Sequence, residues 1–352
     1  MINLIKSELE NFKRNFIFYK RTQAFKKRYQ TIKKELFVKN IPENILQEYR
    51  KKWSIFGKKV ETETLLLCYN LSGKVDLNIV PENIFSAIIE TKLNPHKEIA
   101  FFELKNVYEK WFNNLEVFPK SYFHKIEGTY YDRDFNIIED ISQFLNSIDF
   151  NYPLILKSSR DTYGGEGVRK IKSLEDLWTG IEEFRSLVCQ ELIIQNESLG
   201  SINNSSINSI RTCLLRTETG EFKVINNSIR FGINGSLDNE TSGGIVCSID
   251  ENGIFNEYAV NKYAQKYFSH PNSNVEFKGY KLPFYESLNL TAENIANQIP
   301  LANLISLDMC LDNENIWRCI EINLNGQTIR FAQYAGKGFF GNLTNQIINK
   351  TK

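Results

Sequence analysis

Hydrophobic side chains in the first part of the chain recur three or four positions apart, whereas those in the second part form short runs. The first pattern is typical of amphipathic helices and the second of β-strands. The first helical stripe consists of Leu4, Phe12, Phe16, Phe18, Tyr19, Phe25, Tyr29, Ile32, Leu36 and Phe37. A second stripe runs from Pro81 to about Phe118, and Pro119 ends it. We therefore expect an α+β protein with a helical N-terminal region.

Short β-branched runs separated by Gly, Asn and Asp begin at Pro153 and predict antiparallel strands. The clearest predicted strands are residues 154–157, 209–216 and 222–230. Further on, residues 304–311 and 316–323 flank a polar turn, so they predict a β-hairpin.

Charge is distributed unevenly along the chain. Residues 1–60 contain sixteen Lys or Arg and five Asp or Glu, although the net charge of the whole chain is only +1. This basic segment has two interpretations. It is either an ordinary solvated helix face, or a patch that attracts anionic lipid head groups, a lipid-linked sugar or a partner enzyme.

Composition narrows the class of protein. A chain of 352 residues with 42% apolar side chains can bury a large core, and its balanced charge gives no reason to expect nucleic acid. The start of the chain lacks the apolar core of a signal peptide, and no later run reaches the length of a membrane span, so a cytosolic protein is expected. Six scattered cysteines without a CxxC pair are expected to be reduced core residues.

A predicted strand ending at Lys157 leads into a loop that contains Gly164, Gly165 and Gly167. Glycine allows backbone N–H groups to approach phosphate oxygens, and the lysine supplies a positive charge. The loop lacks the GxxxxGK[ST] pattern of a Walker A motif. Taken alone, it is equally compatible with an ordinary Gly-rich hairpin.

Two further segments contain side chains suited to a nucleotide and a metal. A predicted strand ends in the run Gln190, Glu191, Leu192 and Ile193, and Glu197 follows it. A hinge of this kind can offer its backbone to an adenine edge and a nearby carboxylate to ribose hydroxyls. The alternative is that this segment is an ordinary edge strand.

Asp308, Glu321 and Asn323 lie on the two arms of the predicted hairpin. Their oxygen atoms suit Mg²⁺, because this ion prefers carboxylate and amide oxygens. The alternative is that both carboxylates pair with Arg318 or Lys281 on the sheet surface.

Arg211 and Arg230 lie within otherwise apolar strands. A buried guanidinium requires an anion, which here is either a phosphate or carboxylate of a ligand or the side chain of Asp238 or Glu321.

The chain resembles the ATP-grasp superfamily in the order and spacing of three elements. These are Lys157 with the glycine loop, the hinge at residues 190–193, and the group of Asp308, Glu321 and Asn323. Residues 205–212, 229–232 and 238–244 resemble its sugar-transfer-associated branch, which is linked to exopolysaccharide loci. The resemblance implies an ATP-grasp fold, in which two α+β subdomains hold ATP between antiparallel sheets. It divides the chain into a helical basic region (1–104), a lid subdomain with the glycine loop (105–193) and a C-terminal subdomain with the Mg²⁺, ATP and acceptor site (194–352).

The resemblance also implies residue roles. Lys157 and the glycines would contact phosphate, residues 190–193 the adenine, and Glu197 the ribose. Asp308, Glu321 and Asn323 would hold magnesium, and Arg211 and Arg230 would face the γ-phosphate or the acceptor. A second phosphate-binding lysine is expected upstream, and both Lys105 and Lys125 are candidates.

The implied activity is that of a carboxylate–amine ligase dependent on Mg²⁺ and ATP, which forms an acyl-phosphate on a small or sugar-linked acid during cell-surface polysaccharide synthesis. Two alternatives remain at this point. One is a phosphotransferase that stops at the phosphorylated acceptor, and the other is a non-catalytic scaffold for a glycosyltransferase. A glycosyltransferase or a membrane surface is the expected partner of the basic N-terminal region.

Overall fold

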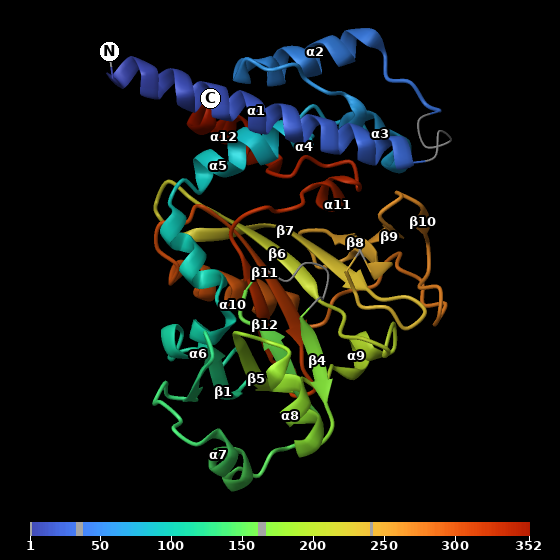
Figure 1. Cartoon of the computed structure of the whole chain (residues 1–352). Helices are drawn as coiled ribbons and strands as arrows, with labels where there is room; N and C mark the ends of the chain where they lie inside the picture. Colours follow the sequence, from blue (N-terminus) through green and yellow to red (C-terminus); the bar gives the residue numbers. More distant parts are fainter. Residues whose placement is uncertain (1, 33–37, 161–166, 240–241) are drawn as a thin grey trace.

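The computed structural model describes residues 2–32, 38–160, 167–239 and 242–352. Three parts follow one another along the long axis of the molecule in Figure 1: a layer of helices, a large sheet and a smaller sheet. All strand pairs within the two sheets are antiparallel. The expected α+β class and helical N-terminal region are therefore confirmed.

The helical layer contains most of the N-terminal region. Its α-helices are α1 (Ile2–Thr31), α2 (Glu43–Trp53), α3 (Glu63–Ser72), α4 (Glu82–Ile84) and α5 (Glu90–Leu93). A π-helical turn, Phe85–Ile89, joins α4 to α5. The chain then descends through the 3₁₀ turns Lys97–Glu103 and Lys105–Val107 and the short helix α6 (Tyr108–Trp111) to the smaller sheet.

The smaller sheet has the strand order β2-β1-β5-β3-β4. Its strands are β1 (Ser121–Ile126), β2 (Thr129–Asp132), β3 (Leu154–Ser158), β4 (Val168–Ile171) and β5 (Leu187–Glu191). Two helices accompany it, α7 (Ile141–Ser147) and α8 (Leu174–Glu182). Each begins where the sequence provides a cap: Asp140 accepts a hydrogen bond from the Gln143 amide, and Ser173 from the Asp176 amide.

The larger sheet has the strand order β10-β9-β8-β7-β6-β11-β12. Its strands are β6 (Ile210–Arg216), β7 (Phe222–Phe231), β8 (Ile245–Ile249), β9 (Phe255–Val260), β10 (Lys266–Tyr267), β11 (Leu304–Leu311) and β12 (Trp317–Asn323). The predicted strands and the predicted β11–β12 hairpin are confirmed. Alternate residues of β11 and helix α10 (Tyr285–Asn297) form an apolar core on one face.

The opposite face of the larger sheet is covered by residues from both ends of the chain. Helices α11 (Arg330–Gln333) and α12 (Thr344–Thr351) join the N-terminal helices in one hydrophobic core, beneath which lie Cys213, Leu215 and Leu304. The blue and red segments of Figure 1 accordingly form a single layer. The last part of the chain thus packs with the helical region as well as with its own sheet.

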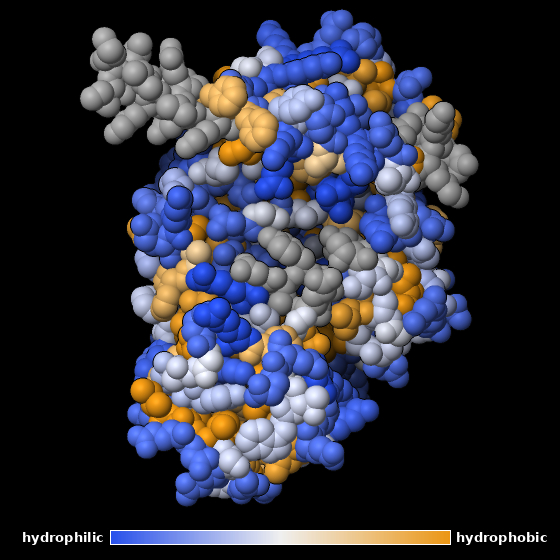
Figure 2. Space-filling model, viewed as in Figure 1, coloured by the Kyte–Doolittle hydropathy of each residue, from blue (hydrophilic) through white to orange (hydrophobic). Residues whose placement is uncertain are grey.

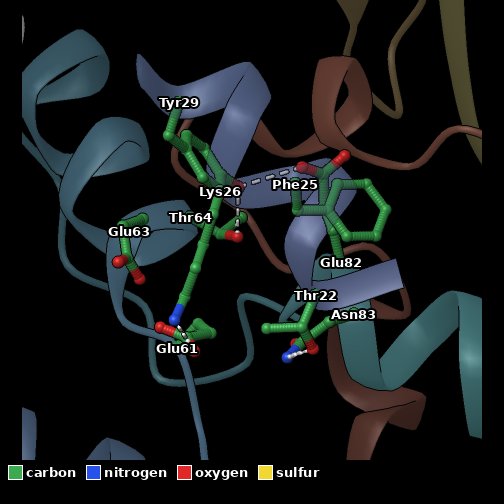
Figure 3. Close-up of a pocket in the computed structure, with 9 residues that line it drawn as sticks. All are labelled: Thr22, Phe25, Lys26, Tyr29, Glu61, Glu63, Thr64, Glu82 and Asn83. Carbon is green, nitrogen blue, oxygen red and sulfur yellow. Dashed lines mark hydrogen bonds and ion pairs between the residues drawn. The ribbon is translucent and has the colours of Figure 1, made fainter. Parts of the chain in front are cut away.

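A buried carboxylate connects the two ends within this layer. Glu82 accepts a hydrogen bond from the Tyr29 hydroxyl at 2.9 Å and lies 3.4 Å from Arg28 Nη1 and 3.5 Å from Arg330 Nη1. Figure 3 shows Tyr29 and Glu82 at the rim of a cavity of about 10 Å³, which has room for one water molecule at most. Because arginines from α1 and α11 share one carboxylate, Glu82 fixes the two helices relative to each other.

The side chain of Glu90 provides a test of how the helical layer is attached. It is buried and accepts a hydrogen bond from the Gln327 amide at 2.7 Å, just after β12, and burial raises its pKa to about 7. A group whose pKa is higher in the folded state than in the unfolded state stabilises the fold fully at a pH below its unfolded-state pKa. This stabilisation is lost as the pH rises through the folded-state pKa. We expect the free energy of unfolding to fall by roughly 3 kcal/mol between pH 4.5 and 7 through this group.

Urea denaturation across this pH range measures the effect. Glu90→Gln should make the free energy of unfolding depend less on pH. The control Glu43→Gln alters an exposed ion pair with Arg50 and should leave the pH dependence unchanged. Equal slopes in wild type and Glu90→Gln would contradict the assignment.

Candidate functional site

Charged side chains gather on the face of the larger sheet that is turned toward the smaller sheet and the helical layer. Asp308 on β11 lies directly opposite Arg211 on β6 and Glu321 on β12. Directly opposed residues project to the same face of a sheet, so the register itself brings these three side chains together. The predicted metal ligands and the predicted arginines thus share one site.

Asp308 is the central group of this site. Arg211 donates to it through Nε at 2.6 Å and Nη2 at 2.9 Å, and Arg230 Nη2 lies 2.8 Å from its Oδ2. Burial alone would raise the pKa of Asp308, but the two guanidiniums outweigh burial and hold that pKa well below its ordinary value. Asp308 is therefore an ionised carboxylate neutralised by two arginines.

Arg230 also connects the site to the loop after β7. Its Nε and Nη2 donate to Ser209 Oγ at 3.0 and 2.7 Å, and Ser209 in turn donates to Asp238. Burial raises the pKa of Asp238, while Arg230, 4.0 Å away, opposes that shift. The alternative partners expected for the arginines are thus not the main ones: Asp238 is 4.0 Å from Arg230, and Glu321 lies one strand beyond Asp308.

Glu321 pairs with a lysine that lies far away in the sequence. Lys105 Nζ is 2.8 Å from Glu321 Oε1, and only 6% of the lysine side chain is exposed. The alternative partner Arg318 binds Asp312 at 2.7 Å instead. The carboxylate therefore faces the smaller sheet and the site.

Lys157 reaches the same place from β3 of the smaller sheet. Burial, and then the nearby charge of Lys105, lower the pKa of Lys157. The other candidate lysine, Lys125 on β1, donates to the Ile181 carbonyl of α8 at 2.8 Å and lies over the Tyr130 ring of β2. The structure therefore brings Lys105 next to Lys157 and Glu321 and leaves Lys125 elsewhere.

Asn323 follows Glu321 on β12 and has an unsatisfied amide. Its Nδ2 is buried and makes no hydrogen bond. A buried polar atom without a partner costs free energy, and such atoms often mark a ligand position. A half-turn of the amide would present its oxygen at this point instead.

The predicted hinge, residues 190–193, connects the two sheets. β5 ends at Glu191, and the following residues cross the β11–β12 turn, where the Ile194 carbonyl accepts a hydrogen bond from the Asn313 amide at 2.9 Å. Glu191 accepts from the Lys120 amide at 2.9 Å, and buried Gln190 donates to the Pro119 carbonyl at 3.3 Å. Leu192 and Ile193 are half-buried, and Glu197 is exposed at the start of α9 (Glu197–Gly200).

Part of the predicted glycine loop lies within the described residues. Gly167 has a φ of 75°, which favours glycine, and its carbonyl accepts a hydrogen bond from the Ser158 amide at 2.8 Å. Gly164 and Gly165 lie outside the described residues. The loop thus begins and ends beside Lys157, which pairs with Val168 across β3 and β4.

A cavity of about 30 Å³ adjoins the two arginines, between the sheet and α11. Its walls are Arg211, Cys213, Asn226, Ser228, Arg230, Val246, Thr328, Phe331 and Ala332. Asn226, Ser228 and Thr328 belong to none of the motifs recognised in the sequence. The alternation of Asn226, Ser228 and Arg230 along β7 was a usable signal, because alternate strand residues share a face. Burial raises the pKa of Cys213 to about 11, so this cysteine presents a neutral thiol.

Part of the chain matches the model of a known protein family. Residues 175–348 match the model of the family described as sugar-transfer associated ATP-grasp, which confirms the resemblance predicted from the sequence. None of the curated proteins matches this chain.

Several solved structures are similar to the chain. Biotin carboxylase from Campylobacter jejuni is 14% identical over 72% of this chain and 47% of that one, with a TM-score of 0.45. N5-carboxyaminoimidazole ribonucleotide synthetase from Thermotoga maritima is 13% identical over 72% of this chain and 50% of that one, with a TM-score of 0.36. The ATP-grasp ligase PsnB is 12% identical over 74% of this chain and 63% of that one, with a TM-score of 0.43. The chain spans about half the length of the first two.

Asp308→Asn tests whether this carboxylate organises the site. The change leaves two half-buried guanidiniums without their buried anion, so we expect the free energy of unfolding to fall by about 3 kcal/mol. Urea denaturation measures the loss, and Glu43→Gln, in an exposed ion pair, should cost less than about 1 kcal/mol. Equal effects of the two changes would show that Asp308 has no central role.

Proposed function

Because residues 175–348 match the sugar-transfer associated ATP-grasp family, we propose that the protein is a carboxylate–amine ligase that uses Mg²⁺ and ATP. It would form an acyl-phosphate on a small or sugar-linked acid during cell-surface polysaccharide synthesis. The observation that supports this most is the meeting of Lys105, Lys157, Asp308 and Glu321 between two sheets joined by a hinge.

The residues present fit Mg²⁺ and ATP. Asp308, Glu321 and the amide of Asn323 offer the hard oxygen atoms that Mg²⁺ prefers, and Asn323 has an unsatisfied buried amide. Lys105 is buried and Lys157 is half-buried, and both are cations of the kind that hold phosphate groups. When bound, Mg²⁺ and ATP supply an activated phosphoryl group.

The ion pairs in the structure balance the charges of the site within the chain itself. Each carboxylate is neutralised by a cation of the same chain: Asp308 by two arginines and Glu321 by Lys105. In the liganded protein, the carboxylates would face the metal and the lysines would face the phosphates. Every buried charge would then exchange one partner for another, so none would be left uncompensated.

The cavity beside Arg211 and Arg230 is the proposed place of the acceptor. Both guanidiniums line this cavity of about 30 Å³, so an acceptor carboxylate in it would meet them. Arginine binds carboxylates with two parallel hydrogen bonds, so a pair of arginines favours an acid over an alcohol as acceptor. Asn226, Ser228 and Thr328 would contact groups next to the acceptor carboxylate.

This preference for an acid supports a ligase over a phosphotransferase. An acid oxygen attacks the γ-phosphorus and ADP leaves, which gives a mixed anhydride. An amine then attacks the acyl carbon, inorganic phosphate leaves and an amide forms. The arginines would stabilise negative charge on the acyl oxygens, and no enzyme nucleophile is needed.

The alternatives remain distinct in their products. A phosphotransferase would release a stable phosphorylated acceptor, and a scaffold would bind ATP without turnover. The basic N-terminal region is proposed to contact a partner, either a glycosyltransferase or a membrane surface, and this surface is separate from the charged site.

Glu321→Gln tests the proposed metal site. The change removes a charge without altering side-chain size, so we expect the fold to persist and turnover to fall by at least about 100-fold. Phosphorus NMR and mass spectrometry with Mg²⁺, ATP and pooled acids and amines would detect ADP, phosphate and any product. Amide formation supports a ligase, a phosphorylated acceptor supports a kinase, and full activity in Glu321→Gln removes the metal assignment.

The two lysines can be tested by nucleotide affinity alone. Lys105→Ala and Lys157→Ala each remove a charge-assisted contact, so we expect the ATP affinity measured by calorimetry to fall by about 10- to 100-fold. Lys125→Ala is the matched control, because the Lys125 ammonium binds the Ile181 carbonyl of α8, away from Lys105 and Lys157. Equal affinities in all three variants would show that neither lysine binds phosphate.

A further inference from the structure

Helix α1 presents large apolar side chains to solvent. Phe12 is 70% exposed, Phe16 49%, Ile17 44% and Tyr19 61%. Phe12, Phe16 and Tyr19 are four and three positions apart, so they form one stripe along the helix. Another side of α1 contacts the rest of the helical layer: Thr22 is buried there, and Tyr29 binds Glu82. The aromatic stripe therefore has no role in holding α1 in place.

A lysine stripe lies beside the aromatic one. Lys20 and Lys27 are both exposed and are seven positions apart, which places them along the same line of the helix. The Lys20 ammonium lies 4.7 Å from the centre of the Phe16 ring, so its aliphatic part runs along the aromatic surface. Residues 12–32 contain seven Lys or Arg and no Asp or Glu. Lys26 and Arg28 pair with Glu61 and Glu82 of the helical layer, but Lys20 and Lys27 are exposed, so the aromatic stripe is bordered by positive charge.

The place of α1 in the molecule makes this surface accessible. Helices α1 and α2 lie at the outer side of the helical layer, at the opposite end of the molecule from α7 and α8 (Figure 1). Figure 2 shows apolar residues interspersed with strongly hydrophilic ones at this end. The cavity beneath α1 measures about 10 Å³ and is too small for a ligand. A convex helix of this kind suits an extended, deformable partner better than a small molecule.

We propose that α1 binds the surface of an anionic lipid bilayer. Phe12, Phe16 and Tyr19 enter the interface between head groups and acyl chains, and Lys20 and Lys27 pair with lipid phosphates. The helix lies on the bilayer, since none of the helices among the described residues is long and apolar enough to cross one. The inference rests on the partner role proposed for the N-terminal region and names that partner, but it does not depend on the chemistry of the charged site.

Co-sedimentation of the full chain with lipid vesicles tests this binding. We expect binding to vesicles that contain phosphatidylglycerol, weak binding to pure phosphatidylcholine, and a decrease as salt screens the lysines. Removing both charges with Lys20→Gln and Lys27→Gln should lower the affinity at least about tenfold. The triple variant Phe12→Ser, Phe16→Ser and Tyr19→Ser should lower it by a similar factor.

A matched control separates the stripe from general surface apolarity. Ile137, Phe268 and Leu290 are 66%, 60% and 61% exposed and lie outside α1, so their replacement by Ser should leave vesicle binding unchanged. The proposal is overturned if wild type does not bind anionic vesicles, or if the aromatic and control variants bind equally. Loss of a dimer in the aromatic variant, with vesicle binding intact, would assign the stripe to a second copy instead.

Calorimetry with Mg²⁺ and ATP on the same variants distinguishes this inference from the proposed activity. Vesicle binding without nucleotide binding would reject the ligase and retain the lipid surface. Nucleotide binding without vesicle binding would reject the lipid surface and leave the proposed ligase in place.

Discussion

The carboxylate of Asp308, held between Arg211 and Arg230, is the constraint around which the larger sheet is organised. A buried carboxylate is tolerated only when cations and hydrogen bonds replace the lost water. Here those cations come from β6 and β7, so the two ion pairs link three strands and fix the register that places Glu321 opposite Asp308. Charged side chains can line the sheet beside the cavity because Asp308, Arg211 and Arg230 neutralise one another.

Local patterns in the sequence were enough to predict much of the fold. Alternating and β-branched runs located β3, β6, β7 and the β11–β12 hairpin, and the charged residues singled out within those runs lie on these strands. The partners of those charges could not be predicted. Asp308 and Arg211 are 97 positions apart, and Lys105 reaches Glu321 from a 3₁₀ turn, so both contacts depend on the three-dimensional arrangement of the strands. Cavity residues such as Thr328 were missed for the same reason.

The helical layer was anticipated only as a region of amphipathic helices. Its actual form depends on contacts between distant segments: Gln333 exchanges hydrogen bonds with the backbone of Val80, and Glu82 binds Arg28 and Arg330. Phe331 and Ala332 then line the cavity beside the arginines. The N-terminal region is thereby mechanically connected to a wall of the site, although it contributes none of the cavity's own side chains.

The shared core at the two ends of the chain also determines the order in which the protein can become complete during synthesis. Phe85 leaves the ribosome well before Phe339 and Phe340, whose rings pack against it. Both sheets can pair their strands in the meantime. Until the last segments are synthesised, part of the apolar face of the N-terminal helices stays uncovered. This layer is therefore the part that a chaperone would bind during synthesis and that premature termination would affect most.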